Sequence, residues 1–415
     1  MEPYRRAASG PLFCTIVLLC LLVAFGGTPA DAQAGSVQHR LALYPASQPL
    51  VKRGFDHFYN SEYDKALHDF ELIVKEHPDN PFATNFLLTG VMFKEFYRIG
   101  ALDSESYAKD SFLDKKAAKA VDPAVRKRVM ELIDIALRQE EALLQINPND
   151  VDALYARGAT RGLRSTWMGM AERAWFSGLR AALAARNDHE KVLQLDPTMV
   201  DAKMTIGVHN YVIGSLNWAG KIAVALVGVT GNKQRGLDYL REVGRSGKLA
   251  NIDAKIALAL FLRREQKYPE ALEVVKGMTE AYPKNFLAAV EYANLLNAAG
   301  HGPQAIAAYR EILANCRRGR YPTSQPQLAA FGLGLSLRGQ RDFPGAAEAF
   351  EMTRNFDGVE SALARRADLA AGEMYDAQKK REAAMKKYEQ VIAGDKDGPE
   401  ADLARKRLRR AYQHD

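Results

Sequence analysis

The stretch "NPNDVDALYARGATRG", residues 147–162, has a second version in "DPTMVDAKMTIGVHN", residues 196–210. Each begins with Asn or Asp before a Pro, continues to Val-Asp-Ala, and has a Gly five residues after that Ala. The prolines, Pro148 and Pro197, are forty-nine residues apart. Because Pro ends a helix and a nearby Asn or Asp caps the next one, each phrase predicts a corner between two helices. A repeated corner predicts a stack of similar helix pairs.

The same corner occurs twice more, in "HPDNPFATNFLLTG" from residue 77 and "YPKNFLAAVEYANLL" from residue 282. Small and aromatic residues recur around it at fixed spacing. Gly54 lies twelve residues before Ala66, Ala66 lies twelve before Pro78, and Phe70 follows Ala66 by one helical turn. Two helices cross closely only where side chains are small, and an aromatic ring fills the space beside the crossing.

This pattern resembles the tetratricopeptide repeat family, whose unit is a 34-residue helix pair. The resemblance implies an all-α, right-handed superhelical solenoid of antiparallel helix pairs. Spacings of seventy and forty-nine residues between corner prolines imply longer, degenerate helices in the middle of the chain. The structural repeat positions that it assigns are Gly54, Ala66, Phe70, Pro78, Gly158, Gly207, Ala271, Pro283, Ala305, Gly334, Ala346 and Ala384.

The chain divides into four predicted parts. Residues 1–34 are a signal peptide, 47–250 are N-terminal repeat-like units with insertions, 251–396 are C-terminal repeat units, and 397–415 form a basic capping helix. An apolar content of 47% over 415 residues supports a large folded core.

The first residues have the layout of a secretory signal. Arg5 and Arg6 precede the apolar run "LFCTIVLLCLLVAFGG" at residues 12–27, and "ADAQA" at residues 30–34 offers small residues for cleavage. An uncleaved membrane anchor is the alternative, since the apolar run is almost long enough to span a bilayer. We therefore expect export to a periplasm or cell envelope, or secretion. The mature chain keeps one cysteine, Cys316, so no internal disulfide is expected.

No motif of an active site, cofactor or metal centre is visible. The eight histidines show no metal-binding spacing, and the Gly-Lys in "GSLNWAGKI", residues 214–222, is wrongly placed for a phosphate loop. We expect no enzymatic activity, no cofactor and no metal, and export argues against nucleic acid. An enzyme or accessory subunit with a site in the central insertion stays a less favoured alternative.

The resemblance implies an interaction scaffold, because the first helices of successive pairs line a concave surface that binds a protein or peptide. We expect such a scaffold to assemble or maintain a cell-envelope complex. Packing between units is the alternative role for each groove candidate. These candidates are Phe55, Phe58, Asp152, Tyr155, Asp201, Met204, Tyr211 and Trp218.

The central insertion, residues 160–236, contains all three tryptophans, Trp167, Trp175 and Trp218. It forms either a buried hairpin or an apolar site for a partner segment or a lipid-like ligand. Peripheral membrane contact through this insertion and the basic C-terminal residues is a second possibility. Residues 211–240 faintly resemble the inclusion-body-clearance family, tetratricopeptide proteins linked to mitochondrial outer membranes and lipid droplets. This resemblance implies no function, and its landmarks are Gly231, Arg235, Gly236 and Leu240.

Overall fold

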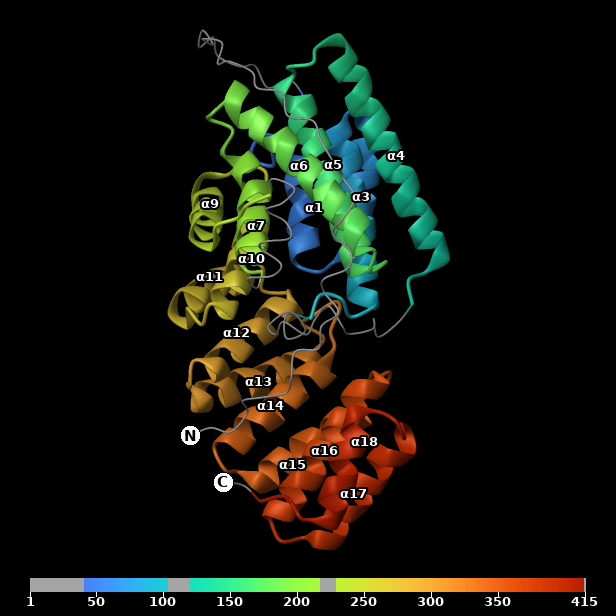
Figure 1. The fold of residues 1–415 in the computed structure, drawn as a ribbon, viewed down its shortest axis with the longest axis vertical. Helices are drawn as coiled ribbons and strands as arrows, with labels where there is room; N and C mark the ends of the chain where they lie inside the picture. The colour runs from blue at the N-terminus through green and yellow to red at the C-terminus, as the bar shows by residue number, and fades with distance from the viewer. Residues whose placement is uncertain (1–40, 104–119, 217–228, 414–415) are drawn as a thin grey trace.

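The computed structural model describes residues 41–103, 120–216 and 229–413. In these residues it is all-helical without strands, with seventeen α-helices and one short 3-10 helix. Figure 1 shows the helices following one another in an elongated stack. The predicted all-α solenoid of helix pairs is confirmed. The predicted signal peptide lies outside the described residues.

The N-terminal half holds four helix pairs. They are α1 (Pro49–Tyr59) with α2 (Tyr63–Glu76), α3 (Pro81–Arg98) with α4 (Pro123–Ile146), α5 (Val151–Met170) with α6 (Trp175–Leu195), and α7 (Lys203–Gly214) with α9 (Lys233–Ser246). The 3-10 turn η3 (Val200–Ala202) leads directly into α7. Helices α4, α5 and α6, with 24, 20 and 21 residues, absorb much of the long spacing between the corner prolines.

The C-terminal half also holds four pairs, followed by a single helix. They are α10 (Asn251–Arg264) with α11 (Tyr268–Ala281), α12 (Phe286–Ala298) with α13 (Gly302–Arg317), α14 (Pro326–Gly339) with α15 (Phe343–Asn355), and α16 (Ser361–Ala377) with α17 (Arg381–Gly394). Helix α18 (Pro399–Arg409) packs against α16 and α17. It covers the end of the stack in the region where the basic capping helix is predicted.

The crossing between the two helices of a pair repeats with the same geometry. A Cβ atom added to Gly54 would lie 2.7 Å from the Phe70 ring, and one added to Gly334 would lie 2.5 Å from the Phe350 ring. In both pairs the glycine precedes the aromatic residue by sixteen positions. The first helix therefore crosses the aromatic ring of the second helix at a distance that only glycine allows.

The two Val-Asp-Ala phrases both begin the first helix of a pair, but they begin differently. Val151 starts α5 directly, because Asp150 caps the helix by accepting the Ala153 N–H at 2.9 Å. The position equivalent to Asp150 is Met199, which offers no cap, and Val200 starts the 3-10 turn η3 instead. The missing cap explains the irregular start.

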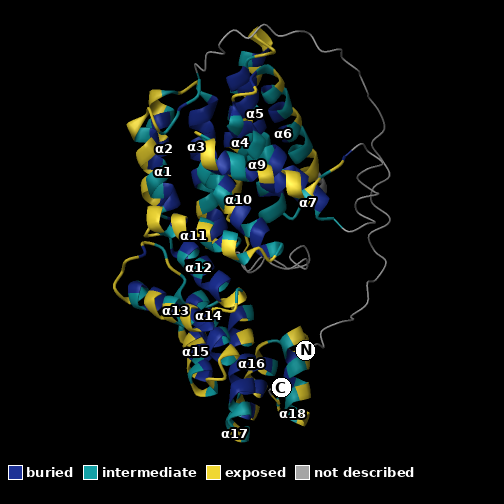
Figure 2. Cartoon of the chain, turned by 90° about the vertical axis from the view of Figure 1, so that its left-hand side faces the viewer, coloured by how far each residue is buried: buried dark blue, intermediate teal, exposed yellow. Residues whose placement is uncertain are grey.

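The helix stack also contacts itself over a long sequence distance. Leu249, Ile252, Tyr282 and Leu287 pack against the core of the first three helix pairs. The core is therefore continuous across residue 250. Figure 2 shows buried residues running through both halves of the stack.

Candidate functional site

Three first helices carry an aspartate at the same repeat position. A third phrase, Ile-Asp-Ala at residues 252–254, joins the two Val-Asp-Ala phrases. Asp152, Asp201 and Asp253 each lie six residues before the small residue of their helix, which is Gly158, Gly207 or Ala259. By the repeat register this position belongs to the concave surface.

All three aspartates are used inside the molecule. Asp201 accepts the N–H groups of Lys248, Leu249 and Ala250 at 2.8–3.0 Å and so holds the start of α10. Asp152 accepts the Leu41 N–H at 2.8 Å. Asp253 accepts the Tyr59 hydroxyl at 3.1 Å. Two of the three aspartates therefore hold the N-terminal part of the chain against later helices.

Two capping asparagines hold the same part of the chain through its carbonyl groups. Asn80 caps α3 by accepting the Phe82 N–H at 2.9 Å, while its amide donates to the Leu41 carbonyl at 2.9 Å. Asn285 caps α12 by accepting the Ala288 N–H at 2.9 Å, while its amide donates to the Tyr59 carbonyl at 2.7 Å. Each asparagine thus joins a helix start to a distant backbone segment.

The turn after α1 adds further contacts with later parts of the chain. Together with the bonds of Leu41 and Tyr59 described above, we call these long-range contacts the closure. The Lys284 ammonium lies 3.1 Å from a Glu62 carboxylate oxygen, and the Lys284 N–H donates to the Asn60 side chain at 3.0 Å. The Thr323 hydroxyl donates to the Ser61 carbonyl at 2.5 Å. Burial alone would raise the pKa of Glu62, but hydrogen bonds from Lys65, His57 and Lys284 outweigh it and lower this pKa to about 2. The first helix pair is therefore held against the starts of α10 and α12 and against the corner that precedes α14.

Burial also alters the acidity of the groups at the centre of this closure. Tyr59 is 7% exposed, and burial followed by the nearby Asp253 raises its pKa well above the usual value. Burial raises the pKa of Asp253 to about 6, against the opposing effect of the Tyr59 hydrogen bond. These shifts show that Tyr59 and Asp253 form a hydrogen-bonded pair that is shielded from water. Without the Tyr59 hydroxyl, the Asp253 carboxyl group would have no hydrogen-bond donor in a poorly solvated site.

The predicted groove residues of the first three pairs contact packing neighbours. The Phe55 ring lies 4.9 Å from Phe86 and 5.1 Å from Phe70, and Phe58 is buried in the same aromatic cluster. Tyr155 stacks on Phe82 with the ring centroids 5.9 Å apart. The structure thus shows a packing role for these three side chains.

The groove residues predicted in the next unit are also engaged in packing. Tyr211 stacks on Phe261 at 3.8 Å and donates its hydroxyl to Glu265 at 2.9 Å. Met204 is partly buried against the core formed by α7 to α12. Trp218 lies outside the described residues.

Three residues of the closure, Asn80, Asp253 and Asn285, were not predicted from the sequence. The recurring corner phrases contain a signal for two of them. Asn80 and Asn285 follow the corner proline by two residues, where the phrase at Pro148 has Asp150, which caps but has no amide to donate. The Ile-Asp-Ala phrase is the corresponding signal for Asp253.

The C-terminal half uses the concave positions differently. Counting from Gly334, the equivalent positions are Leu328, Phe331 and Leu335, all partly buried rather than buried. Counting from Gly372, the position of the three aspartates is taken by Arg366, which is exposed. Its guanidinium carbon lies 4.8 Å from the centre of the Phe331 ring. This half therefore presents an accessible surface of apolar and cationic side chains.

One polar cluster lies in the middle of the N-terminal core. Thr160 Oγ1 is 2.5 Å from Glu140 Oε1, 2.8 Å from Asn85 Oδ1 and 3.1 Å from the Ala156 carbonyl. The Thr160 hydroxyl donates to Glu140 Oε1, and this hydrogen bond opposes a rise in the pKa of Glu140. Burial raises the pKa of Glu140 to about 8, which agrees with a neutral carboxyl group.

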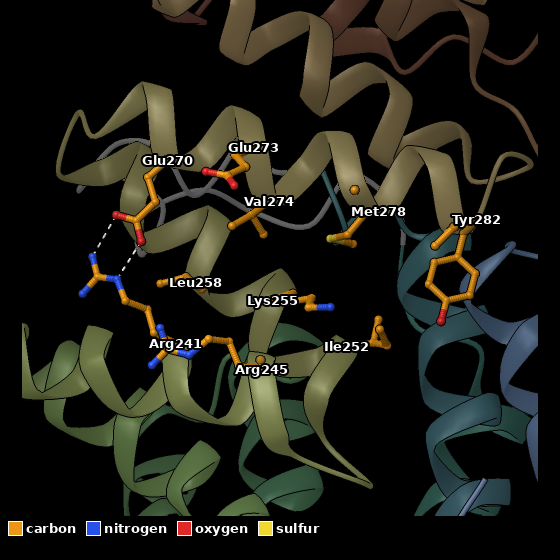
Figure 3. Close-up of a pocket in the computed structure, with 13 residues that line it drawn as sticks. Arg241, Arg245, Ile252, Lys255, Leu258, Glu270, Glu273, Val274, Met278 and Tyr282 are labelled. Carbon is orange, nitrogen blue, oxygen red and sulfur yellow. Dashed lines mark hydrogen bonds and ion pairs between the residues drawn. The ribbon is translucent and has the colours of Figure 1, made fainter. Parts of the chain in front are cut away.

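A pocket of about 350 Å³ lies between α9, α10 and α11. Figure 3 shows Arg241 and Glu270 joined at one end, with Tyr282 at the other end. Two hydrogen bonds of 2.6 and 2.9 Å join that arginine to that glutamate. Leu258, Val274 and Met278 form apolar walls. The pocket thus combines an internally paired arginine with an apolar interior.

Among the described residues, no group of three or more His, Cys, Asp or Glu side chains is arranged to hold a metal ion. None of the described helices is long and apolar enough to cross a membrane.

Comparison with family models gives no match, and comparison with curated proteins gives none either. Solved structures with a similar arrangement include a chain of the APC/C hetero-tetramer Cut9–Hcn1, 13% identical, with a TM-score of 0.48. That match covers 88% of this chain, which spans only 56% of the length of the Cut9–Hcn1 chain.

Two bacterial structures show the same kind of likeness. Pseudomonas aeruginosa PilF is 15% identical over 62% of this chain and 98% of its own, with a TM-score of 0.40. A tetratricopeptide repeat protein from Parabacteroides merdae is 12% identical over 77% of this chain and 97% of its own, with a TM-score of 0.32. The helix pairs, their proline corners and their glycine–aromatic crossings give this chain the architecture of a tetratricopeptide repeat protein.

Proposed function

We propose that this protein is an exported scaffold that binds an extended segment of a partner protein on the concave surface of its C-terminal units. The observation that carries the proposal is the exposed Arg366 guanidinium over the partly exposed Phe331 ring, on neighbouring first helices. The role that fits such a scaffold is assembly or maintenance of a cell-envelope complex.

The contrast between the two halves selects this surface. In α5, in the η3 turn before α7 and in α10, the position six residues before the small crossing residue holds Asp152, Asp201 and Asp253, which bind other parts of the chain. In α14 and α16 this position holds Leu328 and Arg366, and Phe331 lies at the next concave position, three residues after Leu328. A partner therefore has access to the second set while the first set is occupied.

The chemistry of the accessible set suits a protein ligand. Aromatic and arginine side chains are enriched among the residues that dominate binding energy in protein interfaces. Leu328 and Leu335 extend the apolar strip on α14 beside Phe331. An extended segment with apolar side chains and at least one carboxylate, placed near Arg366, complements this strip.

Photo-crosslinking tests the surface. A benzoylphenylalanine residue replaces Phe331 in one variant and Arg310 in a control, since Arg310 is exposed on the second helix α13. The proposal predicts a discrete crosslinked partner from the 331 variant and none from the 310 variant. A partner that crosslinks equally at both positions, or at neither, contradicts it.

Point variants then measure the contributions of the two groups. Phe331→Ala and Arg366→Glu are each expected to weaken binding of the crosslinked partner by at least ten-fold, about 1.4 kcal/mol. Arg310→Glu makes the same charge change on another helix and is expected to leave the affinity unchanged. Equal losses in all three variants would assign the effect to net charge instead of to this surface.

Export is the second element of the proposal, and the signal-like residues 1–34 support it. Fusion of residues 1–40 to a reporter that is active only after export tests this directly. The reporter is expected to be active, and Leu19→Arg in the apolar run is expected to abolish its activity. N-terminal sequencing of the exported product distinguishes a cleaved signal, beginning near residue 33 or 35, from a retained anchor.

The alternative role for an envelope scaffold is peripheral contact with a membrane. We propose the tryptophan-rich insertion as the part that would make this contact. Co-sedimentation of the mature protein with anionic vesicles tests it, with and without residues 217–228. Binding that depends on those residues favours the membrane role, and absence of binding favours the protein scaffold alone.

A further inference from the structure

The eight residues before α1, residues 41–48, cross the starts of three different helices without belonging to any helix pair until α1 begins. We call this segment the strap. It follows the predicted signal peptide and a short intervening stretch. Its contacts define a surface of the folded chain that is distinct from the C-terminal surface around Phe331.

The strap is held by its backbone at Leu41. The Leu41 N–H donates to the Asp152 carboxylate at 2.8 Å, and the Leu41 carbonyl accepts from the Asn80 amide at 2.9 Å. Together these groups bind both polar atoms of a single residue, as a neighbouring β-strand would. This kind of contact selects an extended backbone and does not depend on the side chain of that residue.

Side chains further along the strap supply selectivity. Leu43, two residues after Leu41, is 5% exposed and belongs to the core of the first helix pairs. Tyr44 lies under the Lys248 ammonium, which is 5.8 Å from the ring centre. The surface thus contacts the extended backbone of Leu41, the buried aliphatic side chain of Leu43 and the ring of Tyr44, which lies beneath a lysine ammonium group.

The groups that hold the strap are positioned independently of it. Asn80 is fixed by its capping bond to Phe82, and Asp152 lies in the first turn of α5. Lys248 precedes α10, where Asp201 accepts its backbone N–H. Because the backbone at each of these positions is held by its own helix start, we expect the surface to keep its shape when the strap leaves.

We infer that this surface is an acceptor site for an extended segment of a partner protein with the pattern aliphatic-x-aliphatic-Tyr, and that the strap occupies it in the unbound protein. A partner segment displaces the strap by making the same backbone and side-chain contacts. The inference does not depend on the C-terminal surface, and a failure of crosslinking at position 331 leaves it unaffected.

A labelled peptide of sequence HRLALYPASQ, residues 39–48, is the probe. Fluorescence anisotropy measures its binding to the chain without the predicted signal peptide. In the unmodified protein the tethered strap competes at an effective concentration in the millimolar range, so peptide binding is expected to be weak. Leu43→Asp places a charge in the core and is expected to release the strap, and it should tighten peptide binding by at least ten-fold.

A matched pair of variants tests the recognition itself. Asn80→Asp keeps the helix cap but replaces the amide donor by a carboxylate, and in the Leu43→Asp protein it is expected to return the peptide affinity to the unmodified level. Asn285→Asp makes the same change at α12, where the lost bond goes to Tyr59 instead of the strap. It is expected to leave the peptide affinity of the Leu43→Asp protein unchanged.

Three results would overturn the inference. The first is a Leu43→Asp protein that has native circular dichroism but binds the peptide no better than the unmodified protein. The second is an equal effect of Asn80→Asp and Asn285→Asp on peptide affinity. The third is a dimer, detected by light scattering, that does not bind the peptide. The dimer would mean that straps exchange between two copies. If Leu43→Asp fails to fold, Leu41→Pro removes the N–H that binds Asp152 and serves as the second releasing variant, with the same expected gain.

Discussion

Six residues before the small crossing residue, α5, the η3 turn before α7, and α10 carry Asp152, Asp201 and Asp253, whereas α14 and α16 carry Leu328 and Arg366. The aspartates bind backbone or hydroxyl groups of the same chain. Leu328 is partly buried and Arg366 is exposed. The residue type at a single repeat position therefore decides whether this side of a helix binds another part of the chain or stays accessible.

The difference also explains why the two halves differ in connectivity. In a simple solenoid each unit contacts only its neighbours. Here Tyr59 and Asn285 are joined across 226 positions of sequence, and Tyr59 and Asp253 across 194. At the other end, α18 contacts only the adjacent α16 and α17 strongly. Perturbations are therefore expected to spread in the first half and stay local in the second.

The strongest test of this contrast overfills two equivalent crossings. Ala66 in α2 and Ala384 in α17 are both fully buried. Substitution of either by Trp is expected to cost about 3 kcal/mol or more, because a close helix crossing has no room for the ring. In hydrogen exchange, Ala66→Trp should also deprotect α10 and α12, whereas Ala384→Trp should deprotect only α16 to α18. Equal spreading in both variants would remove the distinction between the halves.

Next in expected size is a pH effect centred on Glu140 in the N-terminal half. Burial raises the pKa of Glu140 to about 8, far above the value near 4.5 of an unfolded glutamate. The folded state therefore keeps a proton that the unfolded state loses. The contribution of this proton to the free energy of unfolding is complete below about pH 4.5. It is lost as pH rises to about 8, at roughly 1.4 kcal/mol per pH unit.

Glu140→Gln tests this effect, because the amide is neutral at every pH. In the variant, the urea concentration at the midpoint of unfolding is expected to fall less between pH 5 and 8 than in the unmodified protein. At pH 8.5 the midpoint of the variant is expected to be the higher of the two. Glu373 is the comparison in the C-terminal half, because burial raises its pKa as well but Arg407 and Arg338 oppose that rise. Glu373→Gln is expected to lower stability at neutral pH, and a gain there would contradict the account.

Removal of one hydroxyl group at the closure should have a smaller effect. Tyr59→Phe leaves Asp253 without its hydrogen-bond donor in a buried setting, at an expected cost of about 1–3 kcal/mol in urea unfolding. Tyr388→Phe removes a similar bond to Asp376. That carboxylate also accepts from Arg381 and from the Tyr412 N–H, so a smaller cost is expected. A larger cost at Tyr388 would reverse the proposed ranking.

The smallest effect concerns the ion pair between Lys284 and Glu62. The lysine side chain is half exposed, so Lys284→Gln is expected to cost less than about 1 kcal/mol, and less still in high salt. Thermal unfolding at low and high ionic strength measures it. A cost that does not depend on salt would mean that the Lys284 side chain acts through packing.

The helix pairs were predictable from the sequence because their determinants are local. Pro148 and Asp150 stop one helix and cap the next within three positions, and Gly54 and Phe70 meet across one turn between helices. The closure was not predictable from these patterns. It depends on the path set by the long helices α4 to α6 and on contacts about 200 positions apart.

The assignment of groove residues shows the same limit. Repeat register placed Asp152, Tyr155 and Asp201 on one side of their helices, but it carries no information on what covers that side. Their burial becomes visible only when the strap and α1 are in place. At the corresponding positions, Phe331 is only partly buried against Phe350 and Arg366 is exposed, so the same register leads there to a more accessible surface.

The Tyr59–Asn285 and Ser61–Thr323 bonds also set an order of events during synthesis. The first helix pair cannot complete its contacts until the ribosome has produced the chain beyond residue 323. Contacts this distant in sequence form slowly, because a long loop must close before they stabilise anything. The first helix pair therefore lacks these stabilising contacts until most of the chain has been synthesised.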